Sequence, residues 1–283
     1  MASFRSASLS CLSKTGFHRI AYRDYEAQDP VPVICLHGLA RNARDFDSLA
    51  EALVAAGRRV VCADVVGRGD SGWLRDPSDY GYPQYLADTA ALIARLDCLQ
   101  VDLVGTSMGG LIGMMLAAQP DSPLRRLVIN DVGPFIPKAA LERILQYFGK
   151  DPRFSDLAAA EAYHRATYRS FGDLSDAQWR HLTETSVRRD GDAWRLHYDP
   201  RIAQPLRQAE LADVDLWELW DRIACPVLVL RGADSDLLLP ETAAEMTRRG
   251  PRSELVEVPG CGHAPALLEA GQIAVVRDWL AAG

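Results

Sequence analysis

The sequence predicts an α/β fold: a mostly parallel central sheet flanked by helices, with a helical cap inserted into it. Three observations support this prediction. Short apolar runs bounded by turn residues alternate with segments of helical periodicity near both ends of the chain. Several of these runs are apolar at nearly every position, as expected of parallel strands that helices cover on both faces. The alternation stops between residues 134 and 222, where helix-like stretches follow one another without a clear strand.

The expected strands and helices of the core alternate along the chain. Strands are predicted at residues 31–36, 59–63, 101–105, 127–130, 227–231 and 255–258. Helices are predicted at residues 46–56, 85–96, 109–118, 240–249 and 272–281. Two weaker strand candidates, residues 7–12 and 17–25, come first and are expected to form an antiparallel edge of the sheet.

The chain is expected to divide into a core, residues 1–133 and 223–283, and a helical cap, residues 134–222. The cap segment holds more than half of the aromatic residues in about a third of the chain. Some of these side chains are expected to pack the cap onto the core, and the others to line an apolar ligand pocket.

Composition narrows the expected partners and location. A chain of 283 residues, 48% of them hydrophobic, is ample for a buried core. The net charge of -7 and the lack of any Lys- or Arg-rich run argue against a nucleic-acid partner, so small molecules are the expected partners. The N-terminal segment lacks the apolar stretch of a signal peptide, and no segment approaches the length of a membrane span. A soluble cytoplasmic protein without a membrane partner is therefore predicted.

The six cysteines show no CxxC spacing. Cys35, Cys62 and Cys225 fall in or beside short β-branched runs, as expected of free thiols that serve as small core residues. The other three are Cys11, Cys98 and Cys261. Neither a metal site nor a cofactor is predicted.

The most informative motif is Gly105-Thr106-Ser107-Met108-Gly109, between an expected strand and an expected helix. A serine at such a sharp turn has a strained backbone, and the flanking glycines remove side chains that would clash there. Its hydroxyl then projects at the carboxyl edge of the sheet, beside a helix N-terminus that favours developing negative charge. Ser107 is therefore the candidate nucleophile, the alternative being a tight turn in a nucleotide-binding fold.

A serine hydroxyl is a poor nucleophile without a base, and position selects one of the six histidines. His263 lies in a glycine-rich loop between the last expected strand and the last expected helix. An imidazole there can reach a serine at the same sheet edge. His164, His181 and His197 fall in the cap and His18 in an early strand, so His263 is the candidate base.

A carboxylate is expected to hold the imidazole in the right tautomer and to stabilise its charged form. The stretch after the strand at 227–231 offers Asp234 and Asp236. We favour Asp236, with Asp234 as a turn-former whose carboxylate bonds nearby backbone amides. Asp131, at the end of the preceding core strand, is the outside alternative.

A tetrahedral intermediate needs hydrogen-bond donors, and the loop after the strand at 31–36 is well placed to supply one. The backbone amides of Leu39 and Met108 are the expected oxyanion hole. His37 is expected to order its loop rather than to transfer protons. The supporting positions of the two loops are His37, Gly38, Gly105 and Gly109.

With these motifs in order, the sequence resembles the α/β-hydrolase superfamily along nearly its whole length. The closest likeness is to the branch with a helical cap, which includes carboxylesterases, enol-lactonases and carbon–carbon bond hydrolases. The motifs that carry the resemblance are Leu36-His37-Gly38-Leu39, Asp64-Val65-Val66-Gly67-Arg68-Gly69-Asp70-Ser71, Gly105-Thr106-Ser107-Met108-Gly109-Gly110, and Gly232-Ala233-Asp234-Ser235-Asp236 with Gly262-His263.

Two further points come from this resemblance. In many relatives the acid stands four residues before a proline, so Pro240 favours Asp236 over Asp234. Epoxide hydrolases and haloalkane dehalogenases have an aspartate at the nucleophile position, so Ser107 argues against both activities.

The resemblance implies acyl transfer without a cofactor. His263 takes the proton of Ser107, an acyl-enzyme forms, and a water activated by His263 releases the acid. The expected activity is hydrolysis of carboxylic esters with small to medium apolar acyl groups, and the expected partner is a small ester or lactone. The alternatives are a lactonase or a carbon–carbon bond hydrolase on the same triad, and a non-catalytic ligand-binding protein on the same scaffold.

Overall fold

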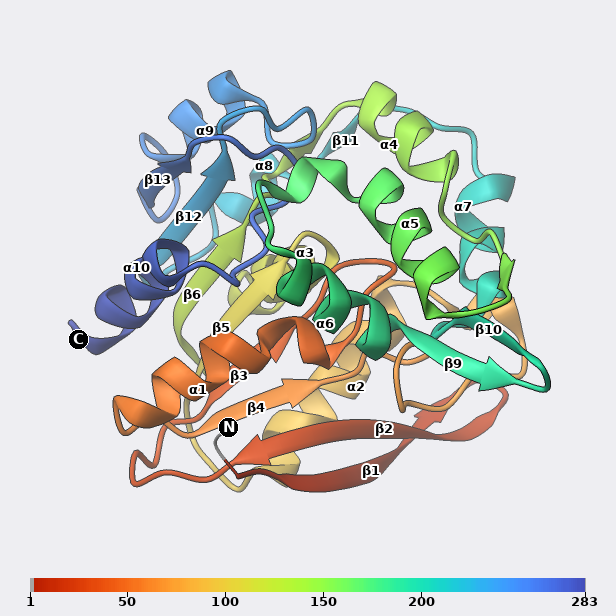
Figure 1. The fold of residues 1–283 in the computed structure, drawn as a ribbon. Helices are drawn as coiled ribbons and strands as arrows, with labels where there is room; N and C mark the ends of the chain where they lie inside the picture. Colours follow the sequence, from red (N-terminus) through yellow and green to blue (C-terminus); the bar gives the residue numbers. More distant parts are fainter. Residues whose placement is uncertain (1–2, 283) are drawn as a thin grey trace.

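A central sheet runs through the computed structural model, which describes residues 3–282 (Figure 1). Its eight strands lie in the order β1-β2-β4-β3-β5-β6-β12-β13. Neighbours from β4 to β13 pair in parallel, whereas β1 pairs antiparallel with β2 and β2 antiparallel with β4. The predicted mostly parallel sheet with an antiparallel edge is therefore confirmed.

The core elements lie at the predicted positions, with ends shifted by a few residues. The strands are β1 (Arg5–Ser13), β2 (Gly16–Tyr25), β3 (Val33–Leu36), β4 (Val60–Ala63), β5 (Val101–Thr106), β6 (Leu124–Asn130), β12 (Val227–Gly232) and β13 (Glu254–Val258). The core helices are α1 (Asp47–Ala55), α2 (Tyr82–Arg95), α3 (Met108–Ala117), α9 (Pro240–Met246) and α10 (Ala270–Ala281). Two short 3-10 helices, η1 (Ala43–Phe46) and η2 (Pro77–Asp79), lie in core loops.

Helices cover both faces of the sheet, which explains why its parallel strands are apolar at successive positions. In β3, Ile34 packs in the layer that contains α2 and α3, and its neighbour Cys35 packs in the layer that contains α1 and α10. Both side chains are fully buried. The six cysteines are free thiols, as predicted.

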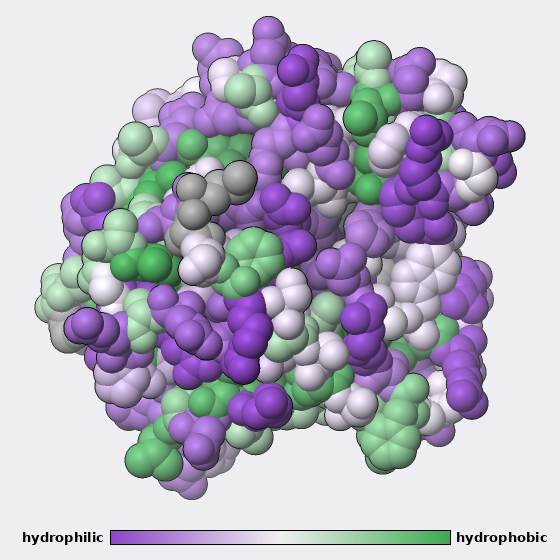
Figure 2. Space-filling view, turned by 60° about the horizontal axis from the view of Figure 1, so that its bottom comes forward, coloured by the Kyte–Doolittle hydropathy of each residue, from purple (hydrophilic) through white to green (hydrophobic). Residues whose placement is uncertain are grey.

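The β1–β2 hairpin forms one edge of the sheet. Figure 2 looks onto the side of the molecule that carries this edge, where hydrophilic residues surround scattered hydrophobic ones. Leu12 and Phe17, which face each other near the hairpin turn, are among the exposed hydrophobic residues. Within residues 3–282, no helix combines the length and the apolar character that a membrane crossing requires.

The chain between β6 and β12 contains far more helix than strand and lies over the carboxyl ends of the central strands (Figure 1). Its helices are α4 (Lys138–Leu145), α5 (Leu157–Thr167), η3 (Arg169–Phe171), α6 (Asp176–Ser186), η4 (Pro200–Ala203), α7 (Gln204–Gln208) and α8 (Trp217–Trp220). The division into a core and a cap at residues 134 and 222 stays a prediction, and its outermost residues 1, 2 and 283 lie outside the described part.

The same segment also contains two small sheets, so the expectation of helices without strands is wrong there. One sheet has the order β8-β10-β9, and the other pairs β11 with β7. The strands are β7 (Phe135–Ile136), β8 (Arg153–Phe154), β9 (Val187–Asp190), β10 (Ala193–Leu196) and β11 (Val214–Asp215). A two-residue loop that begins with Gly191, at a positive φ of 61°, joins β9 to β10.

Candidate active site

Ser107 lies at the turn between β5 and α3, with φ of 52° and ψ of −113°. This positive φ is rare for a residue with a side chain and marks local strain. A side chain at Gly105 would overlap the backbone of Gly109, and one at Gly109 would overlap the carbonyl of Leu36. The strained strand-to-helix turn expected from the motif is therefore present, and its tightness depends on both glycines.

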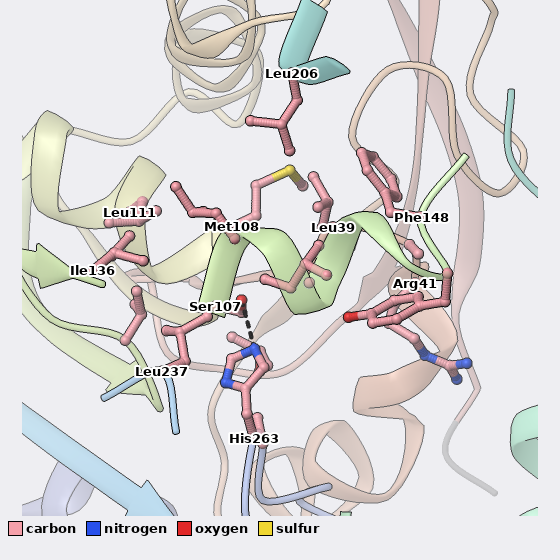
Figure 3. A pocket seen from close by; sticks show the side chains of 18 of the residues that line it. Leu39, Arg41, Ser107, Met108, Leu111, Ile136, Phe148, Leu206, Leu237 and His263 are labelled. Atoms are coloured by element: carbon pink, nitrogen blue, oxygen red, sulfur yellow. Dashed lines mark hydrogen bonds between the residues drawn. The ribbon is translucent and has the colours of Figure 1, made fainter. Parts of the chain in front are cut away.

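His263 reaches Ser107 from the loop after β13. Its Nε2 lies 2.9 Å from Ser107 Oγ (Figure 3), and its Nδ1 lies 2.8 Å from Asp131 Oδ2. A carboxylate at Nδ1 keeps the proton on that nitrogen, so Nε2 is free to accept the hydrogen bond of the Ser107 hydroxyl. The three side chains form one continuous chain of hydrogen bonds.

Asp131 follows β6 directly and is fully buried. Besides His263, its carboxylate accepts hydrogen bonds from the backbone N–H of Gly232 at 2.8 Å and from Ser235 Oγ at 2.7 Å. Three donors thus hold the carboxylate in one orientation. Two of these donors, Gly232 at the end of β12 and Ser235 just after it, flank the stretch that contains Asp234, and Ser235 directly precedes Asp236.

Asp236, the acid favoured from the sequence, is not part of this chain of hydrogen bonds. Its side chain is 52% exposed and forms a two-point ion pair with Arg143 of α4. In this pair Arg143 Nη2 donates to Asp236 Oδ1 at 2.9 Å. The prediction that Asp236 orients His263 is therefore wrong in this structure. The reason lies in the strand order: β6 lies between β5 and β12, so its carboxyl end brings Asp131 between Ser107 and the loop of Asp236.

Leu39 and Met108, the predicted oxyanion-hole residues, both line the cavity beside Ser107 (Figure 3). Met108 begins α3, so its amide has no acceptor within the helix. A Cβ added to Gly38 would lie 3.8 Å from Ser107 Cβ, which brings the loop after β3 against the nucleophile turn. The geometry is compatible with the two donors, whose role stays a prediction.

His37 is buried at the start of that loop, and both of its ring nitrogens are engaged. Nδ1 donates to the carbonyl of Gly38 at 2.7 Å, and Nε2 accepts the N–H of Val65 at 3.0 Å. Burial lowers the pKa of His37 to about 4, so the ring is neutral at physiological pH. These contacts suit the structural role expected for His37.

Arg68 is a residue of this site that the sequence analysis did not single out. It is fully buried, and its Nε donates to the carbonyl of Leu39 at 3.0 Å. Its Nη2 lies 3.6 Å from Met108 Sδ, and its Nη1 donates to Tyr85 Oη at 3.1 Å. One guanidinium therefore contacts both residues of the predicted oxyanion hole. The signal available in the sequence was an arginine inside the Asp64–Ser71 motif.

A cavity of about 560 Å³ opens above Ser107 and His263, between the central sheet and the segment that joins β6 to β12. Most of its lining is apolar and comes from both parts of the chain, including Leu39, Leu111, Ile136, Ile144, Leu206 and Leu237. Phe148 and Tyr168 are buried in the packing of the segment and also line the cavity. The sequence predicts that some aromatic side chains pack the segment and that others line the pocket. Phe148 and Tyr168 do both.

One cluster of the described residues has the chemistry of metal ligands. Cys11, His18 and Asp88 bring one ligand atom each within 4.8 Å of one another. They lie between the β1–β2 hairpin and α2 and are not among the residues that line the cavity. His18 Nε2 contacts both oxygens of Asp88, at 2.9 and 3.0 Å, and this bond fastens the hairpin to α2.

Comparisons with known proteins agree with this fold. Residues 33–277 match the family model described as the alpha/beta hydrolase family. The chain is 46% identical to a 3-hydroxybutyrate-oligomer hydrolase of Cupriavidus necator, with 98% of each chain covered. It is 28% identical to an sn-1-specific diacylglycerol lipase of Mus musculus, with 82% of this chain and 74% of that protein covered.

A solved structure extends the comparison to the fold. The crystal structure of an alpha/beta hydrolase from Novosphingobium aromaticivorans superposes with a TM-score of 0.88. The two sequences are 38% identical, and the superposition covers 99% of both chains. The chain therefore belongs to the alpha/beta hydrolase family, and it is a hydrolytic enzyme.

Proposed function

We propose that the protein is a serine carboxylesterase in which Ser107 is the nucleophile, His263 the general base and acid, and Asp131 the acid of the triad. The observation that carries the proposal is the unbroken chain of hydrogen bonds from Ser107 through His263 to Asp131. The Ser107 end of these hydrogen bonds lies in an apolar cavity, where an ester can reach the serine. All three groups lie within the distances at which protons transfer.

The mechanism follows from the direction of these hydrogen bonds. As Ser107 Oγ attacks the ester carbonyl, its proton passes to His263 Nε2, and Asp131 stabilises the imidazolium that forms. The amides of Leu39 and Met108 stabilise the oxyanion of the tetrahedral intermediate. His263 then gives its proton to the leaving alkoxide, and a water activated by His263 releases the acid from Ser107.

The proposed substrates are short oligomers of hydroxyacids such as 3-hydroxybutyrate. Two observations support this class. A relative that is 46% identical over nearly the whole chain is named a 3-hydroxybutyrate-oligomer hydrolase. The cavity of about 560 Å³ is within the range of about 300–1,000 Å³ that is typical of small-molecule sites, and its aliphatic lining suits the methyl and methylene groups of such oligomers.

The experiment combines active-site labelling with hydrolysis. We expect a fluorophosphonate probe to label one serine per chain, and dimers and trimers of 3-hydroxybutyrate to be cleaved to the monomer. The Ser107→Ala variant should fold normally, refuse the probe and lose activity roughly 10³-fold or more. A folded wild-type protein that refuses the probe and cleaves neither these oligomers nor an activated ester would overturn the proposal in favour of a ligand-binding protein.

A further inference from the structure

The cavity contains a cation whose counter-ion lies outside it. Arg143 of α4 is among the residues that line the cavity, whereas its ion-pair partner Asp236 is not. A second arginine in the lining, Arg41, is different: its partner Asp45 also lines the cavity and takes two hydrogen bonds from it. Both members of the Arg41–Asp45 pair therefore line the cavity, whereas only the cationic member of the Arg143–Asp236 pair does.

The ion pair uses only one edge of the Arg143 guanidinium. A guanidinium carries five N–H groups in a planar fork, and Asp236 accepts from Nε and Nη2. One N–H of Nη1 and the second N–H of Nη2 lie along the opposite edge. That edge has the spacing needed to bind a second carboxylate through two parallel hydrogen bonds.

A second donor lies near Arg143. Tyr147, just after α4, also lines the cavity, and it is close enough for the Arg143 guanidinium to counteract the rise that burial causes in the pKa of its hydroxyl. A phenol can donate to a carboxylate while the guanidinium binds the same group. The ion pair also lies near the reaction centre in the chain. Leu237, which directly follows the Arg143 partner Asp236, lies beside Ser107 and His263 (Figure 3).

We propose that Arg143 and Tyr147 form a subsite for a carboxylate of the substrate, and that Asp236 positions Arg143 for this task. The inference rests on the proposed function. A hydroxyacid oligomer ends in a free carboxylate, which in a dimer is separated from the scissile ester oxygen by two carbon atoms of the leaving hydroxyacid. The enzyme therefore prefers esters whose alcohol part bears a carboxylate over otherwise equal neutral esters.

The experiment compares two dimers of 3-hydroxybutyrate that differ in one group. One has the free terminal carboxylate, and the other has a terminal carboxamide, which is similar in shape but uncharged. We expect wild-type kcat/KM to be roughly tenfold or more higher for the acid, the effect of a hydrogen bond to a charged group. Arg143→Gln should remove this preference, mostly through a higher KM for the acid. Arg143→Lys should restore part of the preference.

Arg248→Gln is the matched control. It removes the same charge from an arginine that is 72% exposed and does not line the cavity, so the preference should be unchanged. Equal rates for both dimers in the wild type, or a preference that survives Arg143→Gln, would overturn the carboxylate subsite and leave the esterase proposal standing.

A binding measurement tests the subsite without catalysis. Calorimetric titration of the Ser107→Ala variant with each dimer should show tighter binding of the acid, and adding Arg143→Gln should abolish the difference. If the wild type cleaves neither dimer, the proposed class of substrates fails, and this titration still decides the subsite: equal affinities for acid and carboxamide would overturn it.

Discussion

Asp131 orients His263 because its own carboxylate cannot turn. The N–H of Gly232 and the hydroxyl of Ser235 hold it from the side of β12, and His263 Nδ1 holds it from the side of β13. An imidazole that is fixed in this way presents Nε2 to Ser107 without losing rotational freedom in each turnover. The place of the Asp131 carboxylate in the fold, next to His263 Nδ1, therefore suits it to orient the imidazole.

Asp131→Asn is expected to lower kcat by roughly 10⁴-fold, as an amide does in other triads, because it can place an N–H instead of an acceptor against His263 Nδ1. Asp236→Asn serves as the comparison, and its kcat on an uncharged p-nitrophenyl ester should fall far less than that of Asp131→Asn. Steady-state rates of the two variants, with circular dichroism to check folding, decide between the two aspartates. A deep loss in Asp236→Asn with a mild one in Asp131→Asn would return the acid to the position favoured by the sequence.

We expect Arg68 to be a positioning residue, since it contacts the predicted oxyanion-hole residues and is not among the residues that line the cavity. Arg68→Met is expected to lower kcat by about tenfold or more with little change in KM, because a displaced donor weakens binding of the transition state more than of the substrate. A boronate that mimics the tetrahedral intermediate should lose affinity in parallel. An unchanged kcat, or a loss confined to KM, would argue against this role.

Motifs located two members of the proposed triad in the sequence, but not the third. Ser107 has a sharp local signature, and His263 lies in a glycine-rich loop after the last strand. Asp131 and Asp236 both follow an apolar run, and only the order of β5, β6 and β12 in the sheet shows which one meets His263. The spacing to Pro240, taken from relatives, pointed to Asp236, which His263 does not contact in this structure. Strand order is a property of long-range pairing, which a single sequence does not display.

At the scale of elements, the approach of α3 to β3 and β5 sets the geometry of the nucleophile turn. Gly109→Ala is expected to destabilise the protein by about 1–3 kcal/mol or more, because the added methyl overlaps the carbonyl of Leu36 and has no room to relax. Gly271→Ala is the matched control. It lies in α10 with open space around it, so it should be neutral or stabilise by up to about 1 kcal/mol. Urea unfolding of both variants measures the difference, and equal stabilities would refute the packing argument.

The elements of the core were predictable because burial on both faces makes their strands apolar throughout. The small strands over the carboxyl edge were not, since they carry charged residues such as Arg188, Arg189 and Arg195 and show no apolar alternation. The Gly191-Asp192 pair in the β9–β10 loop was the available signal. Such a dipeptide predicts a hairpin only when strands are expected on both sides of it, and the hydrophobic pattern of β9 and β10 did not predict strands.

At the scale of the whole molecule, the cavity is a product of two distant parts of the chain. Leu39, Leu111 and Leu237 come from loops and a helix of the core, whereas Ile144 and Leu206 come from the segment over it. The aromatic content of that segment predicted an apolar pocket. Which rings face the pocket could not be predicted, because it depends on how the two parts dock.

Two buried histidines link the fold of the whole molecule to pH. Burial lowers the pKa of His37 to about 4 and that of His164 to about 3, from an ordinary value of 6.5. Between pH 6.5 and these lower values, both rings stay neutral in the folded chain, whereas the same histidines bind protons in the unfolded chain. Their contribution to stability is therefore fully present above pH 6.5 and is lost as the pH falls toward 4 and 3. Burial of Asp64 acts in the opposite direction, because it raises that pKa to about 6, so the folded chain keeps a proton there.

We therefore expect the free energy of unfolding to fall as the pH is lowered from 6.5 to 4.5, and His164→Phe to make this fall shallower. His164 stacks on Tyr168, so phenylalanine keeps a ring in the same place while removing the proton site. One site changes the slope by up to about 1.4 kcal/mol per pH unit. Thr183→Val is the control, since it removes the hydroxyl that contacts His164 Nδ1 at 3.2 Å and leaves the ring able to titrate. Urea unfolding across this pH range measures the slopes; the same slope in His164→Phe as in the wild type would show that His164 is not buried in its neutral form.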